Sequence, residues 1–331
     1  MVVTCPAGFV TAIGAFIVFL SVRVGIRPAA SAKVCSGTRP RPHSGTLDCM
    51  DPAKASATAT GVAVARGAHR SYDQPPWVLD DPFALPLAGP QCAEIQATSE
   101  PALPPVALRQ SRASIVARSR YAEDRLISGG YRQYVILGAG LDSFAWRRAD
   151  LVGWLRLLEV DRPASQAWKR ARIAELGLPV RDGHVFAAVD FETESLRDGL
   201  DRAGLDWSEP AFFSWLGVTI YLTAEAIDAT LRSVSGCGPG SEIVLSYDAS
   251  DAFLDDAARE LVKLEARLVA ATGEPYTTRM SPAQAEALIE GAGLEVLEHL
   301  TPQALYERYF AGRSDGLRPS AAERLIAART G

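Results

Sequence analysis

The chain has 331 residues, of which 48% are hydrophobic, and its formal net charge is −5. This length and composition are typical of a globular protein with its own apolar core, and they exclude a collagenous, a disordered or a small disulfide-stapled chain. The charge is uneven, because residues 1–49 carry +4 and the rest of the chain carries −9. An acidic body lacks the clustered cations that bind phosphate, so nucleic acid is not an expected partner.

An uncharged, mostly apolar stretch occupies residues 6–22, and the first basic residue, Arg23, follows it. Three interpretations stay open: a membrane anchor, an export signal, or an extension outside the folded enzyme. The stretch is at the short end of what spans a bilayer, and a secretory signal carries its positive charge before the apolar run. We therefore expect residues 1–49 to lie outside the fold, Met50 to be a candidate start, and the enzyme to be cytoplasmic, with a membrane partner only if the stretch is an anchor.

The cysteines and histidines predict neither a disulfide framework nor a metal site. The 5 cysteines are odd in number and form no Cys-x-x-Cys pair, and the 4 histidines lie far apart in the sequence. Disulfide frameworks use cysteines densely and in even numbers, and zinc sites group their ligands at short spacings. We expect reduced thiols and no bound metal.

The region before residue 116 is predicted to be a helical cap. Residues 55–70 have a helix-like pattern, and prolines punctuate residues 72–110, which favours short helices and turns over a sheet. We assign residues 50–115 to this cap.

From residue 116 onward, short apolar segments alternate with longer helical ones, which indicates a parallel sheet covered by helices. The predicted strands are Tyr134–Leu137, Leu155–Val160, His184–Val189, Ala211–Trp215, Glu242–Tyr247, Leu294–Leu300 and Arg324–Ala328. The expected fold class is α/β, with a doubly wound, mostly parallel, seven-stranded Rossmann-like sheet and helices on both faces. Residues 116–331 form this core, so that residues 50–331 are one domain.

Several helix boundaries follow from local signals. Pro163 can occupy the first position of a helix, Thr223 can cap another, and the four residues from Ser281 form a capping box whose helix we expect to end at Gly291. Residues 254–271 carry an apolar stripe at helical spacing.

A glycine turn directly follows the first strand and reads Gly138-Ala139-Gly140-Leu141-Asp142-Ser143. Glycines there let the backbone approach a ligand closely. The dinucleotide fingerprint would need a third glycine at Ser143, and the carboxylate of Asp142 would repel a pyrophosphate but attract a sulfonium or an amino group. The turn therefore favours S-adenosylmethionine over NAD.

The ends of the next two strands complete the predicted cofactor site. Asp161 follows the second strand, where a carboxylate accepts hydrogen bonds from a ribose. Asp190 and Phe191 follow the third strand and could contact an adenine through its amine and its ring.

With these motifs, the chain resembles the leucine carboxyl methyltransferase-like family of class I S-adenosylmethionine-dependent methyltransferases, above all its bacterial branch, over about residues 55–330. The matching segments are Asp81–Ala84, Ala117–Tyr121, Val135–Ser143 with Arg147, Glu159–Asp161, Asp190, Trp215–Leu222 and Gly273–Tyr276.

The resemblance implies a role for particular residues. Arg118 would bind the carboxylate of the methionine moiety, with Arg120 as the second candidate. The backbone of Gly138 and Gly140 would line the cofactor, Asp161 would take the ribose hydroxyls, and Asp190 with Phe191 would contact the adenine. Two positions depart from the family: Leu216 stands where many members have glutamate, and only Arg66 is a candidate for the basic residue expected nearer the N-terminus.

The expected activity is S-adenosylmethionine-dependent methyl transfer, most simply to an oxygen of a small molecule or a carboxylate, by in-line displacement. A carboxylate acceptor is already ionised and needs no base, whereas an alcohol or phenol would need one, for which His184 and Asp248 are candidates. No catalytic residue is assigned. A NAD(P)-dependent oxidoreductase and a non-catalytic S-adenosylmethionine-binding protein remain alternatives.

The acceptor pocket is expected over the carboxyl edge of the sheet, between the cap and residues 273–276. Three tyrosines are candidates for its lining: Tyr121, Tyr221 and Tyr247.

Overall fold

A computed structural model describes residues 56–90, 92 and 103–331 of the chain. The predictions for residues 1–49 and for Met50 lie outside these residues. Of the helices within them, none is long and apolar enough to cross a membrane.

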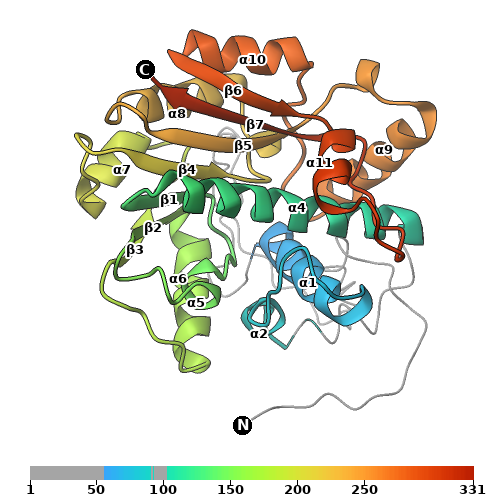
Figure 1. Ribbon diagram of the computed structural model, residues 1–331, viewed down its shortest axis with the longest axis horizontal. Coiled ribbons are helices and arrows are strands. Elements are labelled where there is room, and N and C mark those ends of the chain that lie inside the picture. The colour runs from blue at the N-terminus through green and yellow to red at the C-terminus, as the bar shows by residue number, and fades with distance from the viewer. Residues whose placement is uncertain (1–55, 91, 93–102) are drawn as a thin grey trace, which may run out of the picture.

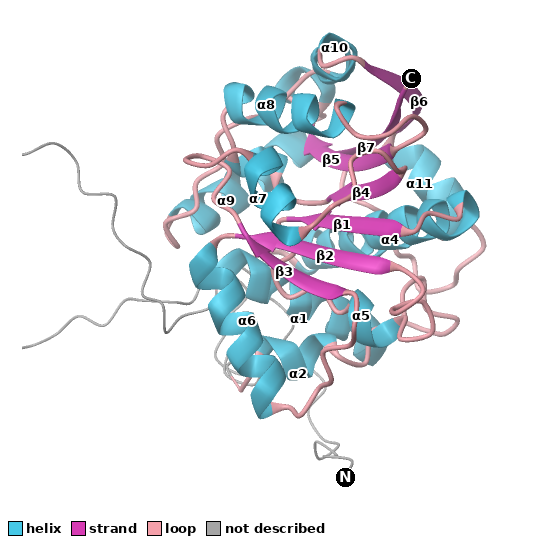
Figure 2. Ribbon diagram, turned by 90° about the vertical axis from the view of Figure 1, so that its left-hand side faces the viewer, coloured by secondary structure: helices cyan, strands magenta, loops and turns pink. Residues whose placement is uncertain are grey.

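One seven-stranded sheet organises the molecule, in the order β3-β2-β1-β4-β5-β7-β6 (Figures 1 and 2). Its strands are β1 (Gln133–Leu137), β2 (Arg156–Asp161), β3 (His184–Ala188), β4 (Ala211–Trp215), β5 (Glu242–Asp248), β6 (Leu294–Leu300) and β7 (Glu323–Thr330). The first five strands pair in parallel, and β7 runs antiparallel between β5 and β6. The predicted fold class and all seven predicted strands are confirmed, with bounds that differ by at most two residues.

Helices cover both faces of the sheet because successive strand residues point to opposite sides. In β1, Tyr134 and Ile136 belong to one apolar core, while Val135 and Leu137 belong to the other. The first core packs against α4 (Pro105–Gly129), α5 (Phe144–Arg147), α6 (Pro163–Glu175) and α11 (Pro302–Tyr309), and the second against α7 (Leu196–Ala203), α8 (Ala224–Ser235) and α10 (Pro282–Gly291). Figure 2 shows this layering along the sheet.

The remaining elements lie around the carboxyl edge of the sheet. Among the described residues, the cap includes α1 (Ala57–Tyr72) and α2 (Ala84–Ala88), and two short 3-10 turns, Thr219–Tyr221 and Asp251–Phe253, follow β4 and β5. Helix α9 (Asp256–Ala270) packs the leucines of its predicted stripe, Leu261, Leu264 and Leu268, against the residues that begin α4.

The local capping signals are confirmed. Thr223 accepts a hydrogen bond from the N–H of Ala226 at 3.2 Å, and the capping box at Ser281 has both of its hydrogen bonds. Helix α10 ends at Gly291, as predicted. The left-handed backbone that terminates this segment lies at Gly293, with φ +86°, two residues later.

The predicted boundary between cap and core at residues 115 and 116 falls inside a single helix. Helix α4 begins at Pro105, which suits the first helical position, and continues until Gly130, which has φ +67°. Helix α4 contacts α1, and its side chains between Ala113 and Leu126 also belong to the first core, so cap and core share this helix.

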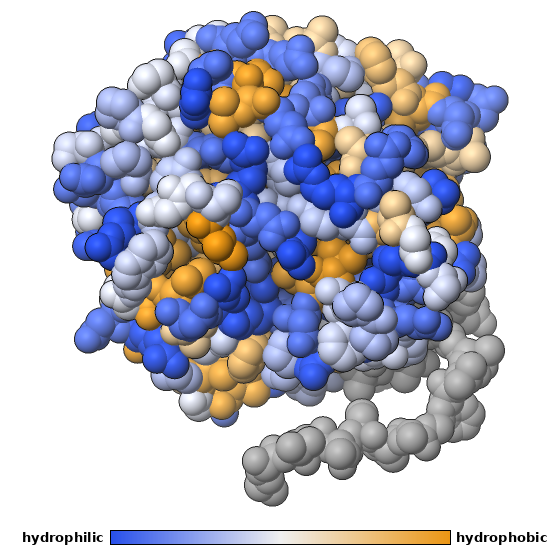
Figure 3. Space-filling model, viewed as in Figure 1, coloured by the Kyte–Doolittle hydropathy of each residue, from blue (hydrophilic) through white to orange (hydrophobic). Residues whose placement is uncertain are grey.

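The surface shown in Figure 3 is mainly polar, with apolar residues in several separate patches. Within the described residues, Cys92 and Cys237 are buried free thiols, and no group of three or more side chains could hold a metal ion.

Candidate functional site

The first cavity lies at the carboxyl ends of β1, β2 and β4, where open α/β sheets bind their ligands. Its wall includes the glycine turn at Gly138–Leu141, the strand ends at Asp161 and Leu216, and the aromatic ring of Phe191. Helix α1 closes the opposite side with Thr58, Ala59, Val62 and Arg66.

The glycine turn needs its glycines for backbone conformation and for space. Gly138 and Gly140 have φ +66° and +47°, in the left-handed region that glycine favours. A Cβ at Gly138 would come within 2.4 Å of Val218 Cγ2, and one at Gly140 within 3.1 Å of Ala59 Cβ. The turn therefore brings backbone to the cavity wall and lets α1 pack directly against it.

Asp161 holds the turn in place from the end of β2. One carboxylate oxygen accepts from the N–H of Gly140, and the other accepts from the N–H of Arg162 at 2.7 Å. Burial raises the pKa of Asp161 despite these two donors. Each carboxylate oxygen keeps a free lone pair, so the group can still accept hydrogen bonds from a ligand in the cavity.

Asp142, which was predicted to attract a cationic ligand, already has cationic neighbours in the protein. Its carboxylate accepts from the N–H of Phe144 at 2.7 Å and lies 3.6 Å from Arg66 Nη1. Burial would raise the pKa of Asp142, but the charges of Arg66, Arg147 and Lys169 outweigh it and hold the pKa below its ordinary value. Asp142 lines the cavity as an already paired carboxylate, and its attraction for a cationic ligand stays a prediction.

Arg118 stands on α4 where the first cavity meets a second one. Its side chain is 10% exposed, and its Nη1 donates to Glu323 Oε1 on β7. The guanidinium lies against Gly217, which has φ +72° and where a Cβ would come within 2.4 Å of Arg118 Nη2. Glu323 and the missing side chain at Gly217 therefore fix the position of this cation.

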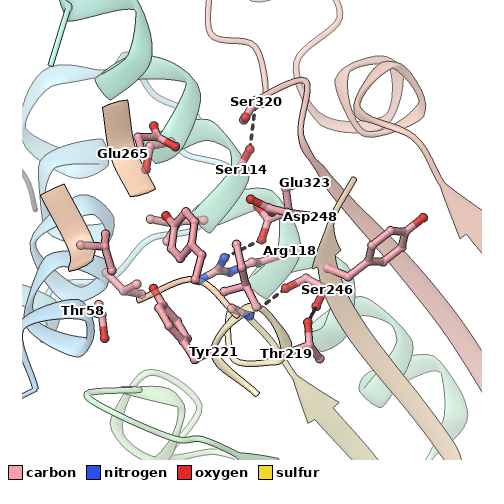
Figure 4. A pocket seen from close by; sticks show the side chains of 18 of the residues that line it. Thr58, Ser114, Arg118, Thr219, Tyr221, Ser246, Asp248, Glu265, Ser320 and Glu323 are labelled. Atoms are coloured by element: carbon pink, nitrogen blue, oxygen red, sulfur yellow. Dashed lines mark hydrogen bonds and ion pairs between the residues drawn. The ribbon is translucent and has the colours of Figure 1, made fainter. Parts of the chain in front are cut away.

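The second cavity shares Thr58, Val62, Arg118, Gly217 and Tyr221 with the first. Its other walls come from strands and helices far apart in the sequence: Asp248 at the end of β5, Glu265 on α9, Tyr276 after α9, and Glu323 on β7. Figure 4 shows Asp248 beside Arg118 and Glu323, with Glu265 on the opposite wall. The rings of Tyr221 and Tyr276 meet edge to face, with centroids 5.7 Å apart.

Two carboxyl groups in the second cavity bind protons unusually tightly. Burial raises the pKa of Asp248 to about 7, helped by the negative charge of Glu323 and opposed by Arg279, Arg118 and Arg324. Burial also raises the pKa of Glu265 to about 8, helped by the charges of Asp248 and Glu323. Proton affinities near neutrality are common where side chains take part in proton transfer.

Hydrogen bonds to Glu274, here called the clasp, attach the N-terminus of α1 beside both cavities. Its carboxylate accepts from the hydroxyls of Ser56 at 3.0 Å and Thr58 at 2.8 Å, and from the N–H of Thr58 at 3.3 Å. These donors lie at the N-terminus of α1, where a negative charge is stabilised by the helix dipole. The segment expected to wall the acceptor pocket, residues 273–276, thus ties α1 down and contributes Tyr276 to the second cavity.

Most of the predicted cofactor residues lie together. Arg118, Gly138, Ala139, Gly140, Asp142, Asp161 and Phe191 all line the first cavity, as do Arg66 and Leu216. Asp190 does not: its carboxylate accepts from the N–H of Glu192 at 3.1 Å and closes the turn after β3. The individual cofactor contacts assigned to these residues stay predictions.

The three tyrosines predicted to line the acceptor pocket do not all lie in one place. Tyr221 lines both cavities, and Tyr247 lines the second while its hydroxyl faces away to His299 Nε2 at 2.8 Å. Tyr121 lines neither; it is buried in the first core and donates to Glu298 Oε2 at 2.7 Å.

Two candidates among the charged residues are also corrected. Arg120 points out of the site, because residues two apart on a helix face nearly opposite directions, and it pairs with Asp124 at 2.7 Å. His184 is buried on β3 with its Nε2 3.1 Å from Glu159 Oε1, and it lines neither cavity.

Sequence reasoning missed Glu265, Tyr276 and Glu323 as individual site residues. Glu265 lies on an amphipathic helix, and its sequence pattern predicts that all of the polar side chains face solvent. Glu323 is the first residue of the last strand. No local pattern distinguishes either side chain, because what places it in the cavity is contact with elements distant in the sequence. Tyr276 belongs to the resembling segment 273–276, which was the available signal.

Known proteins resemble this chain in sequence. The leucine carboxyl methyltransferase family matches residues 59–235, more than half of the chain. A Bacillus subtilis protein, named "Putative S-adenosyl-L-methionine-dependent methyltransferase YktD", is 32% identical over 290 residues, which cover 80% of this chain and 94% of that protein. A Mycobacterium marinum protein with the same descriptive name is 32% identical over 214 residues, which cover 60% of this chain and 69% of that protein.

Solved structures share the fold. A duf574 family protein from Streptomyces avermitilis aligns with a TM-score of 0.51 and 22% identity, over 81% of this chain and 97% of that one. A protein from Thermobifida fusca aligns with a TM-score of 0.51 and 17% identity, over 81% and 94%. At these identities the likeness concerns the fold alone.

Proposed function

The chain belongs to the leucine carboxyl methyltransferase family, and on this premise we propose that it is an S-adenosylmethionine-dependent methyltransferase acting on an oxygen of a small molecule or a carboxylate. The observation that carries the proposal is that the two cavities are adjacent and share Arg118, Gly217 and Tyr221 in their walls. A methyl donor in the first and an acceptor in the second would meet there, which is the arrangement that in-line displacement requires.

The residues of the first cavity fit S-adenosylmethionine. Phe191 offers an apolar face to the adenine, Asp161 offers free lone pairs to the ribose hydroxyls, and Arg118 offers its remaining guanidinium nitrogens to the methionine carboxylate. When bound, S-adenosylmethionine supplies an activated methyl group on its sulfonium. The protein's part is to align donor and acceptor and to exclude water, and the clasp between Glu274 and α1 serves that exclusion.

The family favours a methyltransferase over the NAD(P)-dependent oxidoreductase. Calorimetric titration with S-adenosylhomocysteine and with NADH tests this, and binding of NADH alone would refute the proposal. The non-catalytic alternative draws on Leu216, which lines the first cavity where many family members would place a carboxylate. Tight S-adenosylhomocysteine binding without release of label from methyl-labelled cofactor to a metabolite extract would favour that alternative.

We predict that Asp161→Ala raises the Kd of S-adenosylhomocysteine by about 5- to 150-fold, or ~1–3 kcal/mol, the scale of a hydrogen bond to a charged group. Asp190→Ala is the matched control, because this aspartate also follows a parallel strand but lines neither cavity. Calorimetry should give the control a Kd close to that of the unaltered protein. Equal losses in both variants would show that Asp190 also contacts the cofactor, as the resemblance implied.

A further inference from the structure

We propose that Asp248 is the general base of the methyl transfer and that the acceptor is a hydroxyl compound, an alcohol or a phenol, and not a carboxylate. This inference rests on the proposed function and specifies its acceptor.

Asp248 is placed where a base is needed. It ends β5, whose neighbour β4 leads into Gly217, and the N–H of Gly217 donates to Ser246 Oγ at 2.7 Å, two residues before Asp248. The carboxylate lines the second cavity beside Arg118, next to the junction of the two cavities (Figure 4). Nearby charges act on the carboxylate, but no described residue donates a hydrogen bond to it, so its lone pairs remain available to a ligand.

The other groups of the second cavity are less suited to this role. Glu323 is bound to Arg118, and burial raises the pKa of the Tyr221 and Tyr276 hydroxyls well above the usual range, so neither phenol ionises at neutral pH. Glu265, with a pKa of about 8, is largely protonated at pH 7 and lies across the cavity from Arg118.

The proton affinity of Asp248 supports the geometry. Its pKa of about 7 leaves it part ionised at neutral pH and basic enough to accept a proton in the transition state. The charged groups around it are Arg118 on α4, Glu323 and Arg324 on β7, Arg279 before α10, and Glu265 on α9. A hydroxyl acceptor must lose a proton during transfer, whereas a carboxylate has already lost it.

The charge of the second cavity disfavours a carboxylate acceptor. Among the described residues that line it, Arg118 is the one cation, and Glu323 already neutralises it. The burial and negative charge that raise the pKa values of Asp248 and Glu265 would oppose a further anion in the same way. A neutral hydroxyl compound meets neither obstacle.

The step balances as follows. The acceptor oxygen forms a bond to the methyl carbon while the bond between that carbon and the sulfonium sulfur breaks and leaves its electron pair on sulfur. The hydroxyl proton passes to the Asp248 carboxylate. The products are a methyl ether, a neutral thioether and a protonated Asp248, which returns its proton to solvent.

Product chemistry tests the acceptor class before the acceptor is identified. The full chain is incubated with methyl-labelled S-adenosylmethionine and a deproteinised bacterial extract, and the labelled product is treated with mild base and then with hydriodic acid. A methyl ether keeps its label in base and releases it as methyl iodide in the acid. Label released by base as methanol, or label that resists both treatments as an N- or C-methyl group would, overturns the inference. No incorporation despite S-adenosylhomocysteine binding instead refutes the proposed function itself.

Asp248→Asn tests the base. We expect labelled product to form at least about 100-fold more slowly, with the Kd of S-adenosylhomocysteine unchanged, since a general base contributes about that much to rate. In the unaltered protein the rate should rise with pH through about 7, as Asp248 loses its proton. Glu265→Gln should keep this rise at nearly the same pH, because Glu265, with a pKa of about 8, is already largely protonated where Asp248 loses its proton. An undiminished rate in Asp248→Asn, or a parallel loss of S-adenosylhomocysteine binding, would overturn the assignment.

Discussion

Replacing Asp81 by alanine is expected to lower the free energy of unfolding by about 3–5 kcal/mol, the cost of leaving a buried charge without its partner. The side chain of Asp81 is 0% exposed and lies 3.0 Å from Arg66 Nε and 3.6 Å from Arg147 Nε. It also accepts from Ser143 Oγ at 2.6 Å. One carboxylate thus joins the cap, through Arg66, to the end of the glycine turn, and its loss would leave two buried guanidinium groups undercompensated.

The neighbouring Asp80 is the matched control for this variant. Its side chain is 54% exposed and lies 3.3 Å from Arg70 Nε, so Asp80→Ala should change the free energy of unfolding by at most about 0.5 kcal/mol. Urea unfolding followed by circular dichroism measures both variants. Similar losses in the two would contradict the view that the buried carboxylate links cap and turn.

Gly217→Ala is expected to raise the Kd of S-adenosylhomocysteine by about 5- to 150-fold, equivalent to ~1–3 kcal/mol, the scale of a hydrogen bond to a charged group. The new Cβ would come within 2.4 Å of Arg118 Nη2 and 2.8 Å of Arg118 Cζ. The arginine must therefore shift away from Gly217, which disturbs its hydrogen bond to Glu323 and its position in the wall of both cavities.

Gly240→Ala separates this displacement from backbone strain. Gly240 has φ +80°, close to the +72° of Gly217, but a Cβ there would meet nothing within 4 Å. Both variants should lose about 1 kcal/mol or more of stability from an alanine in the left-handed region, as thermal unfolding would show. Calorimetry should find weakened S-adenosylhomocysteine binding in Gly217→Ala alone. Equal weakening in Gly240→Ala would mean that general destabilisation, and not Arg118, sets the affinity.

The fold could be predicted from the sequence because its signals are local. Strands buried on both faces must be nearly continuous in apolar residues, as in the segments that form β1 and β4, so the sequence itself marks them. The glycine turn and Asp161 could be placed in one site for a related reason. The carboxyl ends of neighbouring parallel strands meet at one edge of the sheet, whatever the details of packing.

Within that site, the sequence could name candidates but not choose among them. Arg118 and Arg120 lie two residues apart, and only the contacts of α4 decide that Arg118 faces the cavities while Arg120 pairs with Asp124 near the surface. Tyr121 and Tyr221 are equal candidates by sequence. In the structure, the Tyr121 hydroxyl donates to Glu298 in the core, whereas Tyr221 lines both cavities.

What the sequence alone determined is therefore the α/β fold, the order of its strands along the chain, and the edge of the sheet where the first cavity lies, because each depends on periodicity and on residues close in the chain. What only the tertiary structure decided is the second cavity. Asp248, Glu265 and Glu323 come from β5, α9 and β7, and they meet only because the antiparallel return of β7 and the packing of α9 bring them together. Their proton affinities arise from that shared burial and from one another's charges, which no local stretch of sequence records.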